Sequence, residues 1–468
     1  MASHHNSTDD ARTSHESSPI PSSQQQPHRT LGFINRQVMA WSLWDWGSAA
    51  FNAVVTTFVF TVYLTDADLF GESANANLGW ALAVAGILVA VVAPAIGQWT
   101  DRTGKRHTIL VAATLGVVAC MALLFFVKPG HSYLWLGLVL VALGNVIFET
   151  GSVVYNTMVT EVSTPQTVGR VSGFGWGMGY VGGIVLLLIL YVGFISPDPG
   201  WFGVTHENGA HIRISMLICA VWMLASSLPI ILTGTNNAPI ESDVHGILGS
   251  YKEIFRSVAR LWRTDRSVVW FLISSAIFRD GLAGVFTFGG VLAAAAFGFS
   301  AGNVMIFGIA ANLVAGIATI LFGRLDDKLG SRAVIIIALS LMTVSGLLVF
   351  FLHGGLHIGP LSLSPTMVFW IFGLVLCVFV GPTQSASRTY LARIAPKGSE
   401  GEIFGLYATT GRAVSFLAPT AYSAAITLAA VSTGLTKADS AHFGILGIVV
   451  VLLVGLLAFI PVKAQAKK

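Results

Sequence analysis

The sequence predicts an all-α membrane protein with twelve transmembrane helices arranged in two similar six-helix halves. Apolar residues make up 54% of the 468 residues and charged residues only 10%, and the mean hydropathy is +0.74. Many apolar segments reach the roughly 20 residues that cross a bilayer. One decapeptide pattern occurs twice, at 97–106 and at 323–332, and we expect each copy to form a tight basic loop between two apolar segments. Two copies at so long a spacing indicate two related halves, which is typical of membrane transporters.

Twelve apolar segments divide the chain into two halves, a linker and two tails. We expect a disordered cytoplasmic tail at 1–39, a six-helix half at 40–232, a cytoplasmic linker at 233–267, a second six-helix half at 268–461 and a cytoplasmic tail at 462–468. The first tail is rich in Ser, His and Gln and has no apolar stretch, unlike a signal peptide. The segments begin near Ala40, Leu78, His107, Ser132, Val171, Ile212, Val268, Ala301, Ala333, Met367, Ile403 and Phe443.

The basic residues set the expected orientation in the membrane. With the amino terminus inside, twenty of the 26 Lys and Arg residues fall on the cytoplasmic side, as the positive-inside rule requires. Both termini are therefore expected in the cytoplasm. The net charge of +4 is spread over short loops, which argues against a nucleic-acid partner.

The linker carries its own pattern. Apolar residues recur at helical spacing between Ile247 and Trp262, with Lys and Arg interleaved. This pattern predicts an amphipathic helix on the inner face of the membrane. A partner-binding helix is the less favoured alternative.

Polar residues inside the apolar segments mark the candidate transport site, because a charge in hydrocarbon is costly unless it faces a cavity or a partner. Spans one and four each carry four polar residues at helical spacing, which places each set on one helix face. Static pairing between helices is the alternative interpretation. The candidate substrate- or ion-binding residues are Asp45 and Asn52 in span one, Asn145, Glu149 and Asn156 in span four, Arg279 and Asp280 in span seven, Gln384 and Arg388 in span ten, and Arg412 in span eleven; Ser48, Thr56 and Ser152 complete the two faces.

The expected depths of these residues differ. At 1.5 Å per helical residue, Asp45 and Arg388 lie near the cytoplasmic ends of their spans, whereas Arg279 and Asp280 approach the midplane. We therefore expect gating roles for the first two. Asp280 is the preferred contact for substrate or for a coupling proton, a task that Glu149 on span four is able to share.

The two repeated decapeptides predict a latch. Each copy contains an acidic residue, Asp101 in the first and Asp327 in the second. We expect each to accept hydrogen bonds from a neighbouring helix end and so to hold the cytoplasmic side shut. The alternative is that their glycines only make tight turns while Lys and Arg fix the topology. The residues of this gating motif are Gly97, Asp101, Arg102, Gly104 and Arg106 in the first copy and Gly323, Asp327, Lys328, Gly330 and Arg332 in the second.

The spacing G-x-x-x-D-(R/K)-x-G-x-R resembles the cytoplasmic loop motif of the major facilitator superfamily. That resemblance implies that the motif acts as a conformational latch and that the first, fourth, seventh and tenth helices line a central cavity. Stretches further along are similar to the vacuole-effluxer branch, which in fungi includes an autophagy-related permease that exports amino acids from the vacuole. These are 41–46, 50–51, 155–156, 170–172, 175, 179–180, 182–183, 280–281, 381, 384, 387–388, 402, 404–407 and 411–412; Trp44, Ser48, Thr160, Arg279 and Arg412 depart from the residues usual there.

The sequence shows no pattern of residues typical of catalysis, metal binding or phosphate binding. Cys120, Cys219 and Cys377 fall in apolar segments without paired or metal-ligand spacing. The glycines of span five, Gly175-x-x-x-Gly179-x-x-x-Gly183, are interpreted as a helix-packing seam and not as a phosphate-binding loop. We therefore expect neither an enzyme, nor a cofactor, nor a metal site.

Together these observations predict a secondary active transporter of small polar solutes that works by alternating access. Amino acids or similar metabolites are the favoured cargo, export is the favoured direction, and protons are the candidate coupling ion. We expect a monomer in a bacterial plasma membrane. The alternatives are a membrane receptor or regulator that transports nothing, and an exporter of amphiphilic compounds or drugs.

Overall fold

The computed structural model describes residues 33–236, 256, 258–263, 265–358 and 361–463. Within these residues, twelve helices are long and apolar enough to cross a membrane, and each begins within about five residues of its expected position. The prediction of twelve spans is confirmed. In the linker, Arg256 and 258–263 are helical. The first tail up to residue 32, and residues 247–255 of the expected amphipathic helix, lie outside the described residues.

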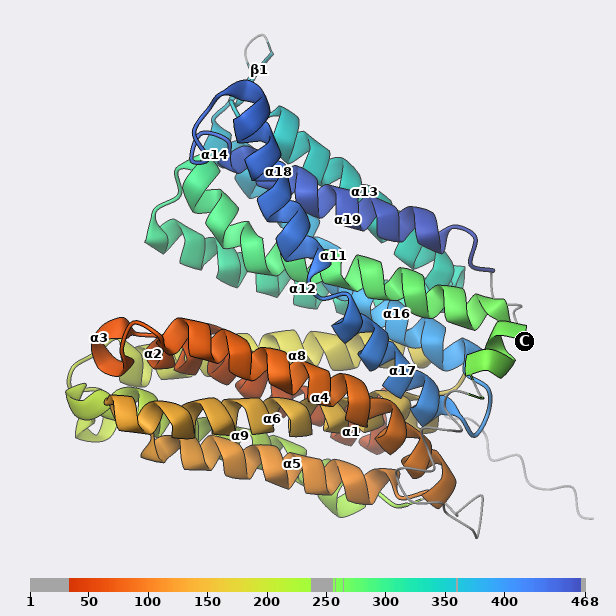
Figure 1. The fold of residues 1–468 in the computed structure, drawn as a ribbon. Helices are drawn as coiled ribbons and strands as arrows, with labels where there is room; N and C mark the ends of the chain where they lie inside the picture. The colour runs from red at the N-terminus through yellow and green to blue at the C-terminus, as the bar shows by residue number, and fades with distance from the viewer. Residues whose placement is uncertain (1–32, 237–255, 257, 264, 359–360, 464–468) are drawn as a thin grey trace, which may run out of the picture. The chain divides into compact units, whose positions relative to one another are not determined.

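Six spans form the amino-terminal half, and Figure 1 shows them together as the bundle α1 to α9. Its elements are α1 (Arg36–Ala49), the π-helix η1 (Ala50–Phe58), α2 (Phe60–Leu64), α3 (Ala67–Phe70), α4 (Ala74–Thr103), α5 (Arg106–Leu123), η2 (Leu124–Phe126), α6 (His131–Thr157), α7 (Val159–Val162), α8 (Val168–Leu190), the π-helix η3 (Tyr191–Ile195), η4 (Trp201–Gly203), η5 (Glu207–Gly209) and α9 (Ala210–Thr233).

The other six spans form the carboxy-terminal half. Its elements are α11 (Arg266–Phe297), α12 (Ala301–Leu329), α13 (Ser331–Phe351), β1 (Leu356–Ile358), β2 (Leu361–Leu363), α14 (Pro365–Val368), the π-helix η6 (Phe369–Gly373), α15 (Leu374–Val378), α16 (Val380–Ile394), α17 (Glu400–Ala413), α18 (Leu417–Thr433), η7 (Ala441–Phe443) and α19 (Gly444–Phe459). The antiparallel hairpin β1–β2, with Leu356 opposite Leu363, is a small addition to the expected all-α fold.

Span eleven is broken, although the sequence predicts one continuous helix. The helix α17 ends at Ala413 and α18 begins at Leu417. In a continuous helix the ring of Pro419 would collide with the carbonyl of Ser415. The break moves Pro419 into the first turn of α18, where proline is tolerated.

Each half has its own hydrophobic core. One core runs through residues between Val38 and Ile230, and the other lies mainly between Leu261 and Val462. The second core also takes in Val89, Ala93 and Ala95 of the amino-terminal half. The two halves are therefore packed against one another through buried apolar side chains as well as through polar groups.

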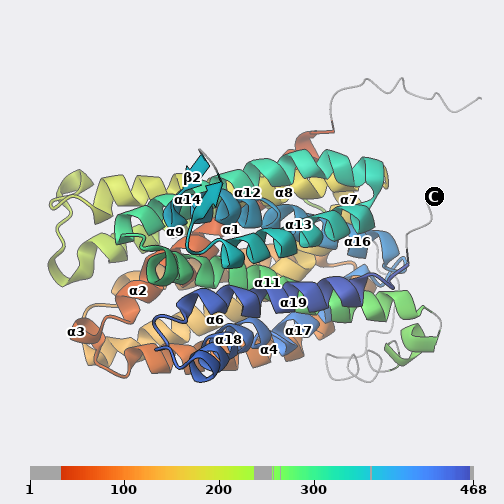
Figure 2. The ribbon, with the colours of Figure 1, turned by 90° about the horizontal axis from the view of Figure 1, so that it is seen from above.

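Two helix pairs make the most extensive contacts between the halves: α8 with α12, and α4 with α17 (Figures 1 and 2). Glycines allow both approaches. A Cβ added to Gly173 of α8 would lie 2.6 Å from the carbonyl oxygen of Thr319, and one added to Gly97 of α4 would lie 2.0 Å from that of Gly401. The expected seam on span five packs within its own half instead, with Gly175 against the ring of Trp41 and Gly183 against Ala49.

The repeated decapeptides lie mostly inside helices, which corrects the expectation of loops. The α4 helix continues to Thr103 and α5 starts at Arg106; α12 continues to Leu329 and α13 starts at Ser331. Of the four motif glycines, only Gly104 (φ +68°) and Gly330 (φ +87°) adopt the positive φ of a turn. The alternative that all four motif glycines make turns is wrong for Gly97 and Gly323, which serve close helix packing. We call the side of the protein with these two turns the motif end.

Candidate functional site

At the motif end, Asp101 caps a helix of the opposite half. Its carboxylate accepts hydrogen bonds from the backbone N–H groups of Gly401 and Glu402, both at 2.9 Å. These groups are the unpaired donors in the first turn of α17, where a negative charge is favoured by the helix dipole. The side chain of Asp101 is 3% exposed, so these bonds are shielded from water.

Arg106 ties this cap into a cluster from both halves. Its guanidinium pairs with Asp101 at 2.5 Å, with Glu161 at 2.8 Å and with Glu400 at 3.1 Å. Glu161 belongs to α7 of the same half, whereas Glu400 starts α17 of the other half. One buried cation on α5 therefore holds three carboxylates from three other helices.

Asp327 makes the corresponding contact in the opposite direction. Its carboxylate accepts from the N–H groups of Gly169 at 2.8 Å and Arg170 at 3.1 Å, in the first turn of α8, and from the Nε of Arg170 at 2.8 Å. Each copy of the motif thus places an acid on the amino-terminal end of a helix from the other half. The two caps are related by the pseudo-symmetry of the repeat.

The arginine that pairs with the capping acid differs between the two copies of the motif. Arg332 occupies the place of Arg106 in the repeat, but it donates to the carbonyl oxygens of Val462 at 2.8 Å and Ile460 at 2.7 Å. Arg393 of α16 replaces it, with contacts of 2.5 Å to Asp326 and 3.3 Å to Asp327. Sequence reasoning did not assign Asp326, Arg393, Arg170 and Glu400 to the site. Arg170 and Arg393 were counted only for the membrane orientation, and the two acids were given no role. Lys328 of the motif is exposed.

A second cluster surrounds Arg388. This α16 side chain is 3% exposed and donates to the Oγ of Ser172 at 2.9 Å, to the carbonyl of Ser172 at 2.7 Å and to the Oδ1 of Asn156 at 3.0 Å. Its guanidinium also lies 4.8 Å from the ring of Trp41. The Oδ2 of Asp45 is 3.8 Å away and accepts from the hydroxyl of Tyr155 at 3.2 Å. A cation of one half is therefore enclosed and hydrogen-bonded by the other half, which offsets its desolvation.

Three further contacts involve spans four, five, seven, ten and eleven. Glu149 of α6 pairs with Arg412 of α17 across the halves, and their side chains are 28% and 33% exposed. Arg279 of α11 stacks 3.7 Å above the ring of Tyr407 and donates to its carbonyl at 2.9 Å. Gln384 accepts from the hydroxyl of Tyr180 at 3.4 Å. Static pairing between helices thus accounts for some of the predicted polar residues. The Glu149–Arg412 pair is the most exposed of the contacts described in this paragraph.

Asp280 is also a helix cap. Its Oδ2 accepts from the N–H of Ala418 at 2.6 Å, and the N–H of Leu417 also donates to the carboxylate. These groups begin α18, just after the break in span eleven. The partners of Asp280 among the described residues are therefore backbone groups, and the side chain is nearly buried.

The two polar helix faces differ in the structure. On span four, Asn145, Glu149, Ser152 and Asn156 are all half-buried, which agrees with one shared face. On span one, Ser48 is 3% exposed whereas Asn52 is exposed. The π-helix η1 begins at Ala50 and changes the residue spacing between them. The single polar face on span one stays a prediction. Within the described ranges no three His, Cys, Asp or Glu side chains are placed to hold a metal ion.

Sequence comparisons agree with this architecture. Residues 159–468 match the family of vacuole effluxer Atg22-like proteins, and residues 7–187 match the Major Facilitator Superfamily. The uncharacterized MFS-type transporter YxiO of Bacillus subtilis is 24% identical over 438 residues, which is 92% of this chain and 95% of YxiO. Autophagy-related protein 22-1 of Aspergillus fumigatus is 23% identical over 280 residues, 56% of this chain and 44% of the fungal protein. The match thus spans less than half of that fungal relative.

Solved structures share the fold. The proton:xylose symporter XylE has a TM-score of 0.67 at 15% identity, and the match covers 92% of this chain and 95% of XylE. The transporter FucP in its outward conformation has a TM-score of 0.64 at 14% identity, over 93% of this chain and 100% of FucP. With twelve spans and two reciprocal caps at the repeated motif, the chain belongs to the vacuole effluxer Atg22-like family of major facilitator superfamily transporters and is a multi-pass integral membrane protein.

Proposed function

We propose that this protein is a secondary active exporter of small polar solutes, with amino acids or similar metabolites as cargo, and that it works by alternating access. The observation that carries the proposal is the pair of reciprocal caps, Asp101 on α17 and Asp327 on α8. Both caps join the halves at one end, and both are made of hydrogen bonds that separate when the halves rock apart. Such contacts have two discrete arrangements, bound and released, as a gate requires.

The motif end is the cytoplasmic end in this proposal, and the membrane is a bacterial plasma membrane. The distribution of Lys and Arg supports this orientation, with both termini inside. The match to YxiO of Bacillus subtilis along nearly the whole chain supports the location. The state described here is then closed to the cytoplasm, and solute leaves toward the opposite side.

The Glu149–Arg412 pair supports a zwitterionic cargo. A free amino acid carries a carboxylate and an ammonium group, and it is able to exchange with the two members of the pair without leaving either charge unpaired. We assign the cargo carboxylate to Arg412 and its ammonium group to Glu149. The pair joins the two halves and its side chains are about a third exposed, so it is accessible and is remade on each transport cycle. Protons are the coupling ion of this proposal, carried by Asp280 or Glu149.

Transport by the purified protein tests the proposal. Proteoliposomes are loaded with an equimolar mixture of amino acids and organic acids, and efflux is followed by mass spectrometry with and without a proton gradient. We expect efflux of a subset of zwitterions, lost in Glu149→Gln and Arg412→Gln and retained in the control Asp439→Asn, which changes an exposed acid far from the motif end. Equal retention of all solutes by wild-type and protein-free vesicles would contradict a transport function for this cargo.

A further inference from the structure

The guanidinium of Arg388 lies among three aromatic rings of the opposite half. Its central carbon is 4.8 Å from the ring centre of Trp41, 5.6 Å from that of Trp176 and 5.8 Å from that of Tyr155. All three distances are within the range in which an aromatic ring attracts a cation. We call these three rings the aromatic cage. Arg388 comes from α16 of one half, whereas the cage is built by α1, α6 and α8 of the other.

Polar groups of the amino-terminal half complete this site. The Oγ and the carbonyl oxygen of Ser172 accept hydrogen bonds from two nitrogens of Arg388, and the Oδ1 of Asn156 accepts one from the third. The carboxylate of Asp45 lies 3.8 Å from this third nitrogen and supplies a negative charge. Each guanidinium nitrogen thus has an acceptor, which is what a planar cation with N–H donors on all sides requires.

Contacts within the amino-terminal half hold two walls of the cage and its acid in place. The Nε1 of Trp41 donates to the carbonyl of Tyr155 at 3.1 Å, and the two rings stack at 4.6 Å. The ring of Tyr155 also stacks on Trp44 at 4.3 Å, and the Nε1 of Trp44 donates to Thr114 at 2.9 Å. The Tyr155 hydroxyl donates to Asp45 at 3.2 Å. These contacts do not involve the carboxy-terminal half, so they stay when the halves separate.

Opening of the motif end withdraws Arg388 from the cage. Arg388 lies five residues before Arg393 on α16, about 7.5 Å along the helix axis, and Arg393 pairs with the acids of the motif end. A separation of the halves at this end therefore carries both arginines away with α16. Asp45 and the acceptors then lose their cation, and a cation from the adjoining solution is the favoured replacement. The Asp45 side chain is 17% exposed even in the closed state, so the site is not sealed on that side.

We propose that the aromatic cage is a binding site for the guanidinium group of a cargo solute, entered from the motif end when Arg388 is withdrawn. This proposal rests on the alternating access proposed above and narrows the cargo to small solutes with a guanidinium group. An amino acid with a guanidinium side chain meets both requirements. On closing, Arg388 returns to the cage and displaces the cargo toward Glu149, which lies seven residues from Asn156 on the same face of α6, about 10 Å along its axis.

Binding of small probes to purified Arg388→Ala in detergent tests the site. The substitution vacates the cage, so guanidinium at saturating millimolar concentration should raise the Tm of this variant by about 2 °C. Urea has the same planar shape without the charge, and tetramethylammonium has no N–H donor, so both should raise the Tm less. Wild-type protein should show no rise, because Arg388 fills the cage. The matched control Arg213→Ala removes a buried arginine that lies 4.7 Å from a single ring, that of Phe125, and should not respond to guanidinium. Equal responses of the two variants, or of the variant Arg388→Ala to guanidinium and urea, would overturn the proposal.

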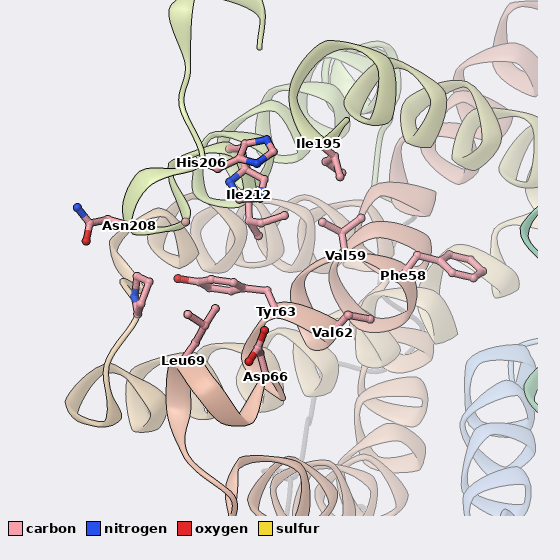
Figure 3. A pocket seen from close by; sticks show the side chains of 13 residues that line it. Phe58, Val59, Val62, Tyr63, Asp66, Leu69, Ile195, His206, Asn208 and Ile212 are labelled. Carbon is pink, nitrogen blue, oxygen red and sulfur yellow. The ribbon is translucent and has the colours of Figure 1, made fainter. Parts of the chain in front are cut away.

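A second cavity of the same half has to be separated from the cage in this measurement. It has a volume of about 590 Å³ and lies around Tyr63 and Asp66, at the segment that leads into α9 (Figure 3). Its described lining residues do not include the three rings of the cage. A cation bound there acts on wild-type protein and on Arg388→Ala alike, so the difference between the two proteins reports the cage.

Transport by the wild-type protein tests the cargo class without a variant of Arg388. Citrulline has the shape of arginine but carries a neutral ureido group in place of the guanidinium group. We expect arginine to leave proteoliposomes about fivefold faster than citrulline, as for a partly exposed ion pair, and Asp45→Asn to lower this ratio. Export of other amino acids without a preference for arginine over citrulline would overturn this proposal and leave the proposed transport function standing. No export of any amino acid would contradict the proposed function and this proposal together.

Discussion

At the scale of single residues, three carboxylates act as helix caps that join distant parts of the chain. Asp101 and Asp327 bridge the halves, and Asp280 bridges α11 and α18. An acid at a helix amino terminus accepts hydrogen bonds that have no other partner and meets the positive end of the helix dipole. The same chemistry therefore serves a contact between the halves and a fixed contact within one half.

The two motif caps should differ in their contribution to transport. Asp101→Asn keeps one acceptor oxygen but leaves Arg106 with less negative charge in a buried cluster, so we expect slower efflux at unchanged protein abundance in the membrane. Asp327→Asn should act similarly or more weakly, because Asp326 still faces Arg393 at 2.5 Å. Efflux from proteoliposomes, normalised to protein content, measures both. Unchanged efflux in the double variant of Asp101→Asn and Asp327→Asn would mean that the motif only sets the orientation in the membrane.

Substitutions of Asp280 distinguish a role as a helix cap from a role as a proton carrier. Asparagine is as good an N-cap as aspartate, so as a cap Asp280→Asn should keep transport and lower the free energy of unfolding by less than about 1 kcal/mol. Asp280→Ala removes the cap and should cost about 1 to 2 kcal/mol. Counterflow without a pH gradient and thermal unfolding distinguish the roles. Loss of pH-driven transport with retained counterflow in Asp280→Asn would show that the acid carries a proton.

At the scale of elements, glycines decide which helices meet. Gly97 of α4 and Gly401 of α17 face each other so closely that a Cβ on Gly97 would lie 2.0 Å from the carbonyl oxygen of Gly401. Backbone cannot move aside as a flexible side chain does, so an added methyl group must push α17 away. The closed motif end therefore depends on the absence of a side chain.

Gly97→Ala should shift the protein toward an open motif end. The reporter is a cysteine introduced by Ser385→Cys, at a position where the native serine is only 3% exposed. In this background, Gly97→Ala should speed up labelling of the cysteine by an impermeant maleimide added from the motif side. The matched control is Gly86→Ala on the same helix, where an added Cβ meets nothing within 4 Å. It should leave the labelling rate unchanged and favour the helix by up to about 1 kcal/mol. Equal rates in both variants would contradict a steric gate at Gly97.

At the scale of the whole molecule, the halves should be lockable by one disulfide. The Oγ atoms of Ser172 and Ser385 lie 3.0 Å apart, one on α8 and one on α16. Cysteines at both positions are then within reach of a bond that needs a short Cβ–Cβ separation. We expect oxidation of the double variant to stop transport and dithiothreitol to restore it. Each single variant is the control, and the native cysteines are buried. Full transport by the oxidised, cross-linked protein would refute alternating access through these helices.

The orientation of the whole molecule is a separate prediction. A reporter fused within 236–250 should read cytoplasmic and one at Gly355 should read external, because basic residues crowd alternate loops. Protease accessibility of tags at the two positions in intact cells measures this. The twelve-span arrangement places three spans between the two positions. Readings from the same side would contradict it.

The sequence by itself determined the number of spans, their limits within a few residues, the two-half organisation and the family. These properties follow from local quantities: the length of each apolar run and the spacing within a repeated decapeptide. The sequence also identified Asp101 and Asp327 as acids placed to meet a neighbouring helix end, a contact that needs only a local helix terminus and a nearby carboxylate.

Only the tertiary structure decided which partner each polar residue meets. Asp326 and Asp327 meet Arg393 and not Arg332, Asp280 meets the first turn of α18, and Gly173 packs on α12. All of these contacts depend on helices brought together from distant parts of the chain. The break in span eleven likewise changes which residues of that span share a face. A helical repeat fixes the direction of a side chain relative to its own axis, but its partner is set by how the axes pack.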